Sequence, residues 1–485
     1  MGIVLKQSFT NTLILFLGFA IGGINVLFLY THFLHEDYYG LNTFLLSTAN
    51  ILLPLLVLGM QHTIIKFYTS YRTKYEQDQF LTSALLLPLF IIIPLAILGS
   101  FFYETIANWL SKENNIIKPY TYLIFLTAIF MGYFEVFYAF SKIQYKSVFG
   151  NFLKEIFSRI CTSILLVGVY LQWITDVQFI YAIVIVYGIR MLIMMFSAFK
   201  LYKPDFIIKF PENSKEILSY SFYIILAGSA SGILLDIDKF MIPQMEQIAE
   251  VAYYAVGIYI ASVIAIPSRA MQQIINPLTA KELNSNNLKE VENLYKKSSI
   301  TLLVAGGLLF LLINLNINDL YAFINKPEYA VGGMIVLMIS IAELYKLSLG
   351  TNGAILTNSN HYRVFFYFSI AMAISVVFLN RWLIQLLGID GAALATLIVV
   401  LIFSTVKIIY VQLKLNMQPF TKKTILVLTI ISILFLIFYS ITIPFHPIVN
   451  MVLKSLIITI VYIFTIYKLN ISEDINVLIK KYFRL

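Results

Sequence analysis

Apolar stretches, each about as long as one membrane crossing, alternate with short polar segments along the whole chain. A transmembrane helix needs about 20 largely apolar residues, and about fourteen stretches fit this template. These stretches cover 10–33, 41–65, 80–103, 119–140, 149–171, 178–199, 217–240, 250–275, 298–316, 330–355, 362–386, 390–413, 423–443 and 448–467. The pattern predicts an all-α integral membrane protein with about fourteen transmembrane helices.

Composition supports this fold class. The 485 residues are 60% hydrophobic and 12% charged, whereas soluble domains are about 45–50% apolar and about 25% charged. The first apolar stretch is longer than the roughly 7–15 residues of a signal-peptide core, so we interpret it as a retained helix. The single cysteine, Cys161, excludes an intrachain disulfide and a cysteine metal cluster. We expect no cofactor.

The net charge of +9 is distributed unevenly between the loops. With the N-terminus inside, the inside loops and tail carry Arg72, Lys74, Lys142, Lys146, Lys200, Lys203, Lys209, Lys215, Lys281, Lys289, Lys296, Lys297, Arg363, Lys414, Lys422, Lys423, Lys468, Lys480, Lys481 and Arg484. The outside loops carry Lys112, Lys118, Lys239, Lys326 and Arg381. This asymmetry follows the positive-inside rule and predicts that both termini are cytoplasmic. It also explains the basic charge without nucleic-acid binding.

Two short sequence echoes indicate an internal repeat. The segment 36–40 (EDYYG) resembles 250–255 (EVAYYA), and 174–176 (ITD) resembles 388–390 (GID), with both pairs about 214 residues apart. We therefore predict a first six-helix lobe within 1–210, a second within 211–415, and two further helices with a cytoplasmic tail in 416–485. Repeats of this kind, related by an axis along the membrane normal, suit rocking of two lobes around a central cavity.

The segment 388–396 (GIDGAALAT) opens the predicted twelfth span, and Asp238-Lys239 ends the seventh. Together with 252–259 (AYYAVGIY) and 39–41 (YGL), these motifs resemble the polysaccharide flippases of the multidrug/oligosaccharidyl-lipid/polysaccharide exporter superfamily. The resemblance covers essentially the whole chain. The small residues of GAALAT also favour close helix packing without any contact to substrate.

This resemblance implies a MATE-like fold and alternating access. It implies transport of an undecaprenyl-pyrophosphate-linked oligosaccharide across the bacterial inner membrane, with ion coupling in some members. The saccharide would be a repeat unit of O-antigen, capsule or exopolysaccharide. Membrane lipids and a glycan polymerase or ligase are the implied partners.

Cationic side chains within the predicted spans are candidate ligands for pyrophosphate, since arginine and lysine both bind phosphate. The candidates are Arg269, Arg159, Arg190 and Lys66, with Asn352 as a candidate sugar contact. Arg269 lies between Pro267 and Pro277, which suggests a broken helix of the kind that lines cavities. Each cation also has an ordinary explanation as a membrane anchor, and Arg159 can pair with Glu155 at i,i+4.

Other charges are candidates for ion coupling or gating. Glu135 is a carboxylate inside the fourth span, and His62 near the end of the second could titrate; a structural hydrogen bond or ion pair is the favoured explanation of Glu135, and a satisfied histidine at the membrane interface that of His62. Asp236, Asp238 and Lys239 lie near the end of the seventh span. Asp236 and Lys239 can pair at i,i+3, which favours an outer gate or a contact between lobes over a buried coupling site.

Two other functions remain open. One is a cation-coupled small-molecule antiporter of the same fold. Such exporters of the superfamily often have an acid in the first span, whereas the nearest polar residue here is Asn25, and an amide cannot titrate. This function is therefore less favoured. Flippases of the peptidoglycan precursor lipid II typically have arginines in their early spans. The first two spans of this chain contain none, which argues against transport of lipid II. A membrane glycan polymerase, an enzyme, usually has a large outside loop, whereas the longest here is 104–118. We therefore expect a transporter and not an enzyme.

The longest loop of the whole chain, 276–297, is polar enough to form a short surface helix.

Overall fold

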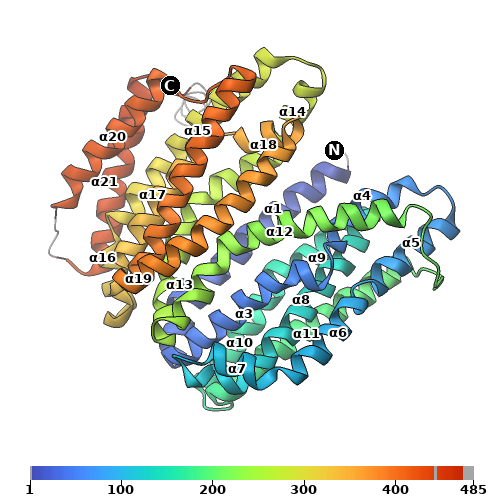
Figure 1. Cartoon of the computed structure of the whole chain (residues 1–485). Coiled ribbons are helices and arrows are strands. Elements are labelled where there is room, and N and C mark those ends of the chain that lie inside the picture. The colour runs from blue at the N-terminus through green and yellow to red at the C-terminus, as the bar shows by residue number, and fades with distance from the viewer. Residues whose placement is uncertain (1–2, 442–444, 473–485) are drawn as a thin grey trace. The chain divides into compact units, whose positions relative to one another are not determined.

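The computed structural model describes residues 3–441 and 445–472, and all regular secondary structure in these residues is helical (Figure 1). Within them, eleven helices are long and apolar enough to cross a membrane. One of these, α19 (Tyr362–Leu415), holds two predicted spans on either side of a kink at Gly388. The predicted spans 149–171 and 217–240 are also helical. The prediction of an all-α membrane protein is therefore confirmed.

The chain divides into two compact units, Met1–Ala252 and Tyr253–Leu485. The helices of the first unit are α1 (Ile3–Ile24), η1 (Asn25–Leu29), α2 (Tyr30–Phe33), α3 (Glu36–Leu56), α4 (Met60–Phe67), η2 (Tyr68–Ser70), α5 (Lys74–Leu86), α6 (Leu89–Phe101), α7 (Tyr103–Leu110), η3 (Asn115–Tyr120), α8 (Thr121–Ile143), α9 (Val148–Phe152), η4 (Leu153–Phe157), α10 (Ser158–Tyr170), α11 (Asp176–Leu201), α12 (Ser214–Met241) and η5 (Ile242–Gln244).

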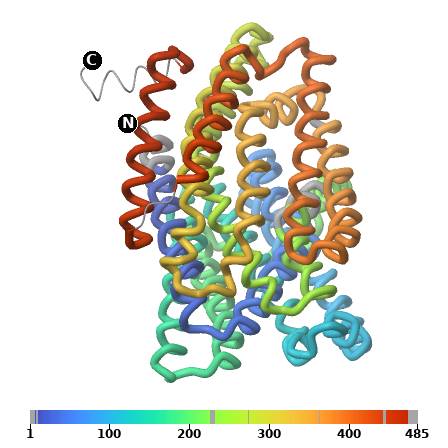
Figure 2. Tube along the Cα trace, turned by 90° about the vertical axis from the view of Figure 1, so that its left-hand side faces the viewer, coloured from blue at the N-terminus to red at the C-terminus, as the bar shows by residue number. Residues whose placement is uncertain are grey.

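The second unit takes in the end of α13 (Ile248–Ser262) and forms a bundle whose helices run side by side from green to red in Figure 2. Its further elements are η6 (Val263–Ala265), α14 (Ile266–Asn284), α15 (Leu288–Asn314), α16 (Ile317–Ile324), η7 (Pro327–Gly332), α17 (Gly333–Ser348), α18 (Asn352–Asn358), α19, α20 (Lys422–Tyr439) and α21 (Pro447–Lys468).

The helix α12 packs against α3 and α4 of the first unit. The Nδ2 atom of Asn50 on α3 donates to Asp236 on α12 at 2.6 Å, and Thr63 on α4 hydrogen-bonds Ser221 at 3.0 Å. The sequence instead places this helix at the start of the second lobe. The lobe boundaries at 210 and 415 stay predictions.

The internal repeat recurs in the order of the elements. In the first unit, the eight-residue α7 is followed by the six-residue helix η3 and then by α8. In the second unit, the eight-residue α16 is followed by the six-residue η7 and then by α17. Since α7 and α16 begin at Tyr103 and Ile317, this similarity has the same offset as the sequence echoes.

Both repeats also contain an interrupted helix. Between α3 and α4, Leu58 and Gly59 adopt φ angles of 52° and 60°, and between α13 and α14 the 3-10 turn η6 intervenes. The break predicted around Pro267 and Pro277 thus lies just before Pro267, whereas Pro277 is inside α14. The predicted loop 276–297 is wrong in extent, because α14 continues to Asn284 and α15 begins at Leu288.

The predicted motif at 388–396 forms the kink and a closely packed turn of α19. Gly388 has φ 58° and ψ −139°, a conformation that a side chain disfavours. A Cβ atom on Gly391 would lie 2.0 Å from the carbonyl oxygen of Leu383. Ala392, Ala393 and Ala395 are fully buried, so these small residues pack within the second unit.

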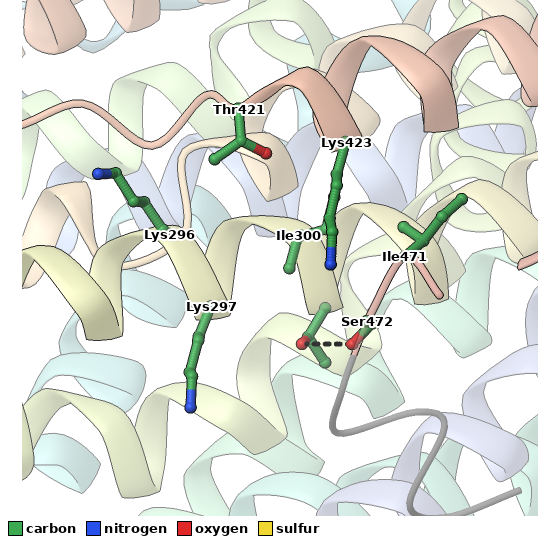
Figure 3. Close-up of a pocket in the computed structure, with 8 residues that line it drawn as sticks. Lys296, Lys297, Ile300, Thr421, Lys423, Ile471 and Ser472 are labelled. Atoms are coloured by element: carbon green, nitrogen blue, oxygen red, sulfur yellow. Dashed lines mark hydrogen bonds between the residues drawn. The ribbon is translucent and has the colours of Figure 1, made fainter. Parts of the chain in front are cut away.

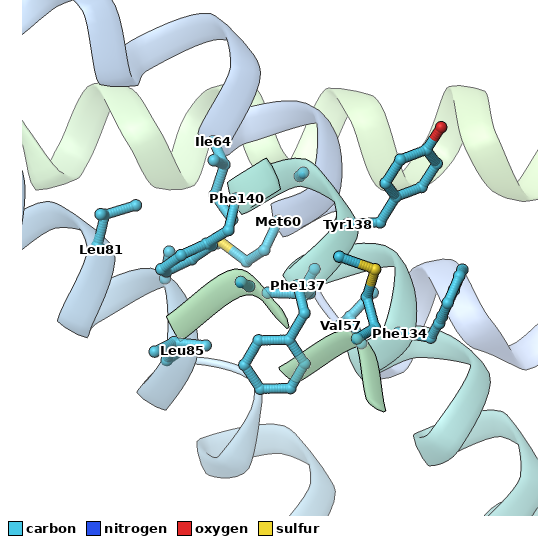
Figure 4. Close-up of a cluster of buried hydrophobic side chains, with 14 of the residues drawn as sticks. Val57, Met60, Ile64, Leu81, Leu85, Phe134, Phe137, Tyr138 and Phe140 are labelled. Carbon is cyan, nitrogen blue, oxygen red and sulfur yellow. The ribbon is translucent and has the colours of Figure 1, made fainter. Parts of the chain in front are cut away.

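A buried apolar cluster holds α4, α5 and α8 together in the first unit. Figure 4 shows its labelled side chains between these helices: Val57, Met60, Ile64, Leu81, Leu85, Phe134, Phe137, Tyr138 and Phe140. Since lipid tails are as apolar as these side chains, the helices are held together here by close van der Waals packing. The cluster fixes α8, which carries the charged residues considered next.

Candidate functional site

Six charged side chains gather inside the first unit, and we call them the charge cluster. They are Glu135 and Lys142 on α8, Lys154 and Glu155 on η4, Arg159 on α10 and Arg190 on α11. Each is linked to another member by an ion pair or by an electrostatic interaction. The cluster lies in a part of the chain whose helices are otherwise almost entirely apolar.

The centre of the charge cluster is an ion pair between Glu135 and Lys154. The Nζ atom of Lys154 lies 2.6 Å from Oε1 of Glu135, and 18% of the Glu135 side chain is exposed against 45% for Lys154. Charge-assisted hydrogen bonds of this kind are about twice as strong as neutral ones. The pair compensates an acid that would be costly to leave alone at this depth.

Arg190 is buried and stacks on two aromatic rings. Its Cζ atom lies 4.3 Å from the ring centre of Phe134 and 4.5 Å from that of Tyr187. Glu135 and Glu155 act on it electrostatically. Its Nε atom has no hydrogen-bond partner among the described residues. The stacking holds the planar guanidinium in place while at least one donor remains available.

The predicted pair of Glu155 and Arg159 is confirmed, with 3.3 Å between Oε2 and Nη1. Helix α1 lies directly against it, since a Cβ atom on Gly18 would be 2.7 Å from Arg159 Nη1. Nearby, Asn25 donates to the Arg159 carbonyl at 2.8 Å and accepts from Ser163 at 2.6 Å. Asn25 is therefore a hydrogen-bonded contact between the first span and α10.

Two of the predicted site residues, His62 and Lys66, lie on α4 outside the charge cluster. His62 is exposed and within electrostatic reach of Glu135, Lys142 and Lys154. Lys66 is also exposed, and its Nζ atom lies 3.8 Å from the ring centre of Tyr220. Lys142 makes a similar contact, 3.9 Å from the ring centre of Tyr138. The cations of this region are thus held by aromatic faces as well as by carboxylates.

The charge cluster carries four cations against two carboxylates, a net charge of +2. Lysine binds phosphate as a point charge, and arginine can bind it through two parallel hydrogen bonds. The backbone at the cluster is also irregular: η4 and η1 are π-helical, and each packs beside a neighbouring helix. Such turns are frequent at functional sites. The cluster can therefore accept an anionic group.

The charges near the end of α12 form a second, smaller group. Asp236 is buried and receives a 2.9 Å ion pair from Lys239 and a 2.6 Å hydrogen bond from Asn50 on α3. Asp238 is buried as well. The predicted i,i+3 pair is confirmed within α12, and the hydrogen bond from Asn50 ties α12 to α3 within the first unit.

The remaining candidates lie in the second unit. Arg269 is exposed on the first turns of α14. Asn352 is 1% exposed and donates to the hydroxyl of Tyr295 at 2.6 Å. Asn352 is a buried contact between α18 and α15. The roles of both residues in substrate binding stay predictions.

Three of the predicted inside cations line a small pocket of about 150 Å³ in the second unit. Figure 3 shows Lys296 and Lys297 projecting from α15 and Lys423 from the start of α20, with a hydrogen bond of 3.3 Å joining Thr301 and Ser472. Lys423 donates to the Asn470 carbonyl at 2.9 Å. The further tail cations Lys480, Lys481 and Arg484 lie outside the described residues.

Reasoning from the sequence missed Lys142 and Lys154 as site residues. The loop charges place Lys142 in an inside loop, and Lys154 lies in the span 149–171 without an assigned role. These lysines could have been found from Glu135, because an acid within a membrane span needs a nearby cation as its partner. Lys142, Lys146 and Lys154 are the first three lysines that follow it in the sequence, and two of them lie in the charge cluster.

Comparison with known proteins adds a family and a fold. Residues 4–281 match the family described as polysaccharide biosynthesis protein. None of the curated proteins compared with the chain matches its sequence.

Solved structures with the same fold include the lipid II flippase MurJ in an inward closed conformation, with a TM-score of 0.70 at 15% identity, covering 95% of this chain and 99% of that one. An inward-facing multidrug resistance MATE transporter of the MOP superfamily has a TM-score of 0.61 at 13% identity, covering 84% and 94%. A MOP superfamily transporter from Pyrococcus furiosus has a TM-score of 0.55 at 12% identity, covering 85% and 96%. At these identities the similarity shows the fold alone, and that fold is MATE-like.

Proposed function

Since this chain belongs to the polysaccharide biosynthesis protein family, we propose that it is a flippase for a lipid-linked saccharide. The proposed substrate is an undecaprenyl-pyrophosphate-linked oligosaccharide, carried from the cytoplasmic to the outer leaflet of a bacterial inner membrane. Both termini are then cytoplasmic. The proposed mechanism is alternating access, in which the two repeats rock around the bound substrate.

The observation that carries this proposal is the net positive charge cluster inside an apolar unit. A pyrophosphate is anionic and must cross a medium in which an uncompensated charge is costly. Arg190, Arg159, Lys154 and Lys142 supply cations at that depth, and Glu135 and Glu155 hold two of them. A neutral drug-like cargo has no need of such an excess of cations.

We assign different roles to the members of the charge cluster. Arg190, pre-positioned by Phe134 and Tyr187, is the proposed bidentate ligand of the pyrophosphate. Lys154 is the proposed mobile cation, because nearly half of its side chain is exposed and it can leave Glu135 for a phosphate oxygen. The exchange would free the Glu135 carboxylate, which makes Glu135 and the adjacent His62 the proposed groups for proton or ion coupling.

The wider pathway is proposed from the family alone. The transported saccharide would be a repeat unit of O-antigen, capsule or exopolysaccharide. A glycan polymerase and a ligase would then use it on the outer side of the membrane. We further propose that the chain has no enzymatic activity of its own, since the family and the fold are those of transporters.

The second candidate, a cation-coupled small-molecule antiporter, has the support of the shared fold. Against it stands Asn25, an amide already satisfied by Arg159 and Ser163 in the position where an acid is expected. Lipid II is less favoured as a substrate because the first arginine of the sequence is Arg72, beyond the first two spans.

The direct test is deletion of the gene, followed by measurement of surface glycan and of lipid-linked intermediates on each side of the membrane. We expect loss of the surface glycan and accumulation of its lipid-linked precursor on the cytoplasmic side, both restored by the wild-type gene. Complementation by Arg190→Gln should fail, whereas Lys200→Gln, which alters an inside cation outside the charge cluster, should succeed. Normal surface glycan without trapped precursor in the deletion strain would refute the proposal.

A further inference from the structure

A pocket of about 550 Å³ opens among α15, α16, α17, α20 and α21, entirely within the second unit. This volume lies within the roughly 300–1,000 Å³ of small-molecule sites. Its polar lining includes Asn314, Asn318, Asp319, Asn450 and Lys454. We call it the α21 pocket, and none of the roles assigned above involves it.

Two residues of α21 are unusual for a membrane helix. Asn450 and Lys454 are four residues apart on a sequence that is otherwise almost wholly apolar, so they lie on the same face. Each is 8% exposed. Burying an amide and an ammonium in such a helix is costly unless both find partners. Polar groups placed at this cost mark a candidate site.

Contacts within the protein explain only part of this arrangement. Lys454 donates to the Leu315 carbonyl at 2.9 Å, which caps the end of α15. Asn450 Nδ2 donates to Asp319 Oδ1 at 3.3 Å. An ammonium has three donors, and an amide oxygen can accept two hydrogen bonds. Asn450 Oδ1 is buried and has no hydrogen-bond partner among the described residues, so a buried acceptor beside the pocket remains available.

The lining selects a neutral, hydroxyl-rich ligand. Lys454 and Asp319 balance each other, so the pocket has no net charge, and the Asp319 carboxylate disfavours an anion. Asn314, Asn318 and Asn450 both donate and accept, as a polyol requires. Phe435 and Tyr439 supply an apolar wall for the C–H face of a ring. An acyl chain would leave the buried amides unsatisfied.

We propose that the α21 pocket binds a sugar residue. The choice of a sugar over other neutral polyols rests on the proposed function. The pocket is built from the ends of α15 and α20 and the starts of α17 and α21, which the loop charges place on the outer side of the membrane. It would therefore hold a saccharide on the side to which it is delivered, away from the pyrophosphate and its lipid.

The proposal is tested with the full chain, purified and reconstituted in lipid nanodiscs, by saturation-transfer difference NMR. The probes are glucose, galactose, mannose and N-acetylglucosamine, none of which carries a phosphate or a lipid. We expect saturation transfer to at least one of them. Asn450→Leu should weaken the binding of that sugar by about tenfold, the equivalent of about 1.4 kcal/mol. Asn293→Leu, which changes an exposed asparagine at the other end of α15, is the matched control.

A variant at the exposed rim guards against a folding defect. Tyr439→Leu removes the ring of a residue that is 68% exposed, so it should weaken sugar binding without changing the melting temperature. The same change at Tyr75, exposed in the first unit, should leave binding unchanged. Equal saturation transfer in the wild type, Asn450→Leu and Tyr439→Leu would overturn the proposal.

The outcomes also separate this site from the proposed function. No saturation transfer to any probe, with normal flipping of the lipid-linked precursor in cells, would reject the α21 pocket and leave the flippase intact. Saturation transfer that Asn450→Leu abolishes, together with normal surface glycan in the deletion strain, would support the pocket and reject the flippase.

Discussion

The Nζ atom of Lys154 on η4 lies 2.6 Å from Oε1 of Glu135 on α8, and this contact joins two segments that are 19 residues apart in the sequence. Lys142 and Arg190 add positive potential around the same carboxylate. Glu135 is therefore an acid surrounded by more cations than it can neutralise. An anion that enters the charge cluster competes with Glu135 for Lys154.

This competition makes Glu135 a sensitive position. Glu135→Gln removes the partner that positions Lys154 and the only carboxyl group of α8. We expect transport to fall by about tenfold or more, since one charge-assisted hydrogen bond contributes about 1.5–3 kcal/mol. Initial rates of lipid-linked substrate flipping in proteoliposomes at several pH values provide the measurement. Glu135→Gln proteoliposomes with wild-type rates at every pH would exclude Glu135 from coupling. The control is Glu216→Gln, which removes a carboxyl group at the start of α12.

Arg190 should not tolerate replacement even by another cation. Arg190→Lys keeps the charge but loses the planar group that stacks on Phe134 and Tyr187 and can bind phosphate through two hydrogen bonds. We expect flipping to fall severalfold while the melting temperature changes little. The matched control is Arg72→Lys in an exposed loop. Full activity of Arg190→Lys would show that only its charge matters.

The ion pair at the end of α12 is expected to stabilise the first unit. Asp236→Asn removes the partner of Lys239, and breaking a fully buried pair costs about 3–5 kcal/mol. The loss should be smaller here because 17% of the Lys239 side chain is exposed. Thermal unfolding in detergent should show a lower melting temperature for Asp236→Asn. Adding Lys239→Met to this variant should recover part of the loss by removing the unpaired ammonium.

Gly388 should resist substitution for a reason of backbone geometry. With φ at 58° and ψ at −139°, a side chain there costs about 1–3 kcal/mol. Gly388→Ala should therefore lower the melting temperature and the yield of folded protein. Gly353→Ala is the control, because a Cβ atom at Gly353 meets nothing within 4 Å. Equal stability of the two variants would show that α19 straightens without cost.

Much of the fold follows from the sequence because membrane helices are specified by local hydrophobicity. The pairs Glu155–Arg159 and Asp236–Lys239 were predictable for the same reason, since helical spacing alone brings their side chains together. The pair Glu343–Lys346 on α17 forms through the same i,i+3 spacing.

Contacts between helices could not be predicted in this way. The pairing of Glu135 with Lys154 depends on how η4 packs beside α8, and the burial of Asn352 depends on Tyr295 of a separate helix. The proline-containing α14 stays helical to Asn284, and the polar residues from Leu288 onward form the start of α15, because hydrogen bonds within a helix need no apolar face. The sequence pattern identifies candidate residues, and tertiary packing decides which of them meet.

The π-helical turn η4 has a consequence for the residues that follow it. Its five residues, Leu153–Phe157, carry hydrogen bonds one residue longer than those of an α-helix. The one additional residue in this turn rotates the side chains of the following helix α10 by about 100° around the helix axis. Deleting a residue from this turn would leave α10 a regular helix but would turn Arg159 away from α1 and Ser163 away from Asn25 on η1. The direction in which the charges of α10 point is thus encoded by the length of the turn before them as well as by their own positions.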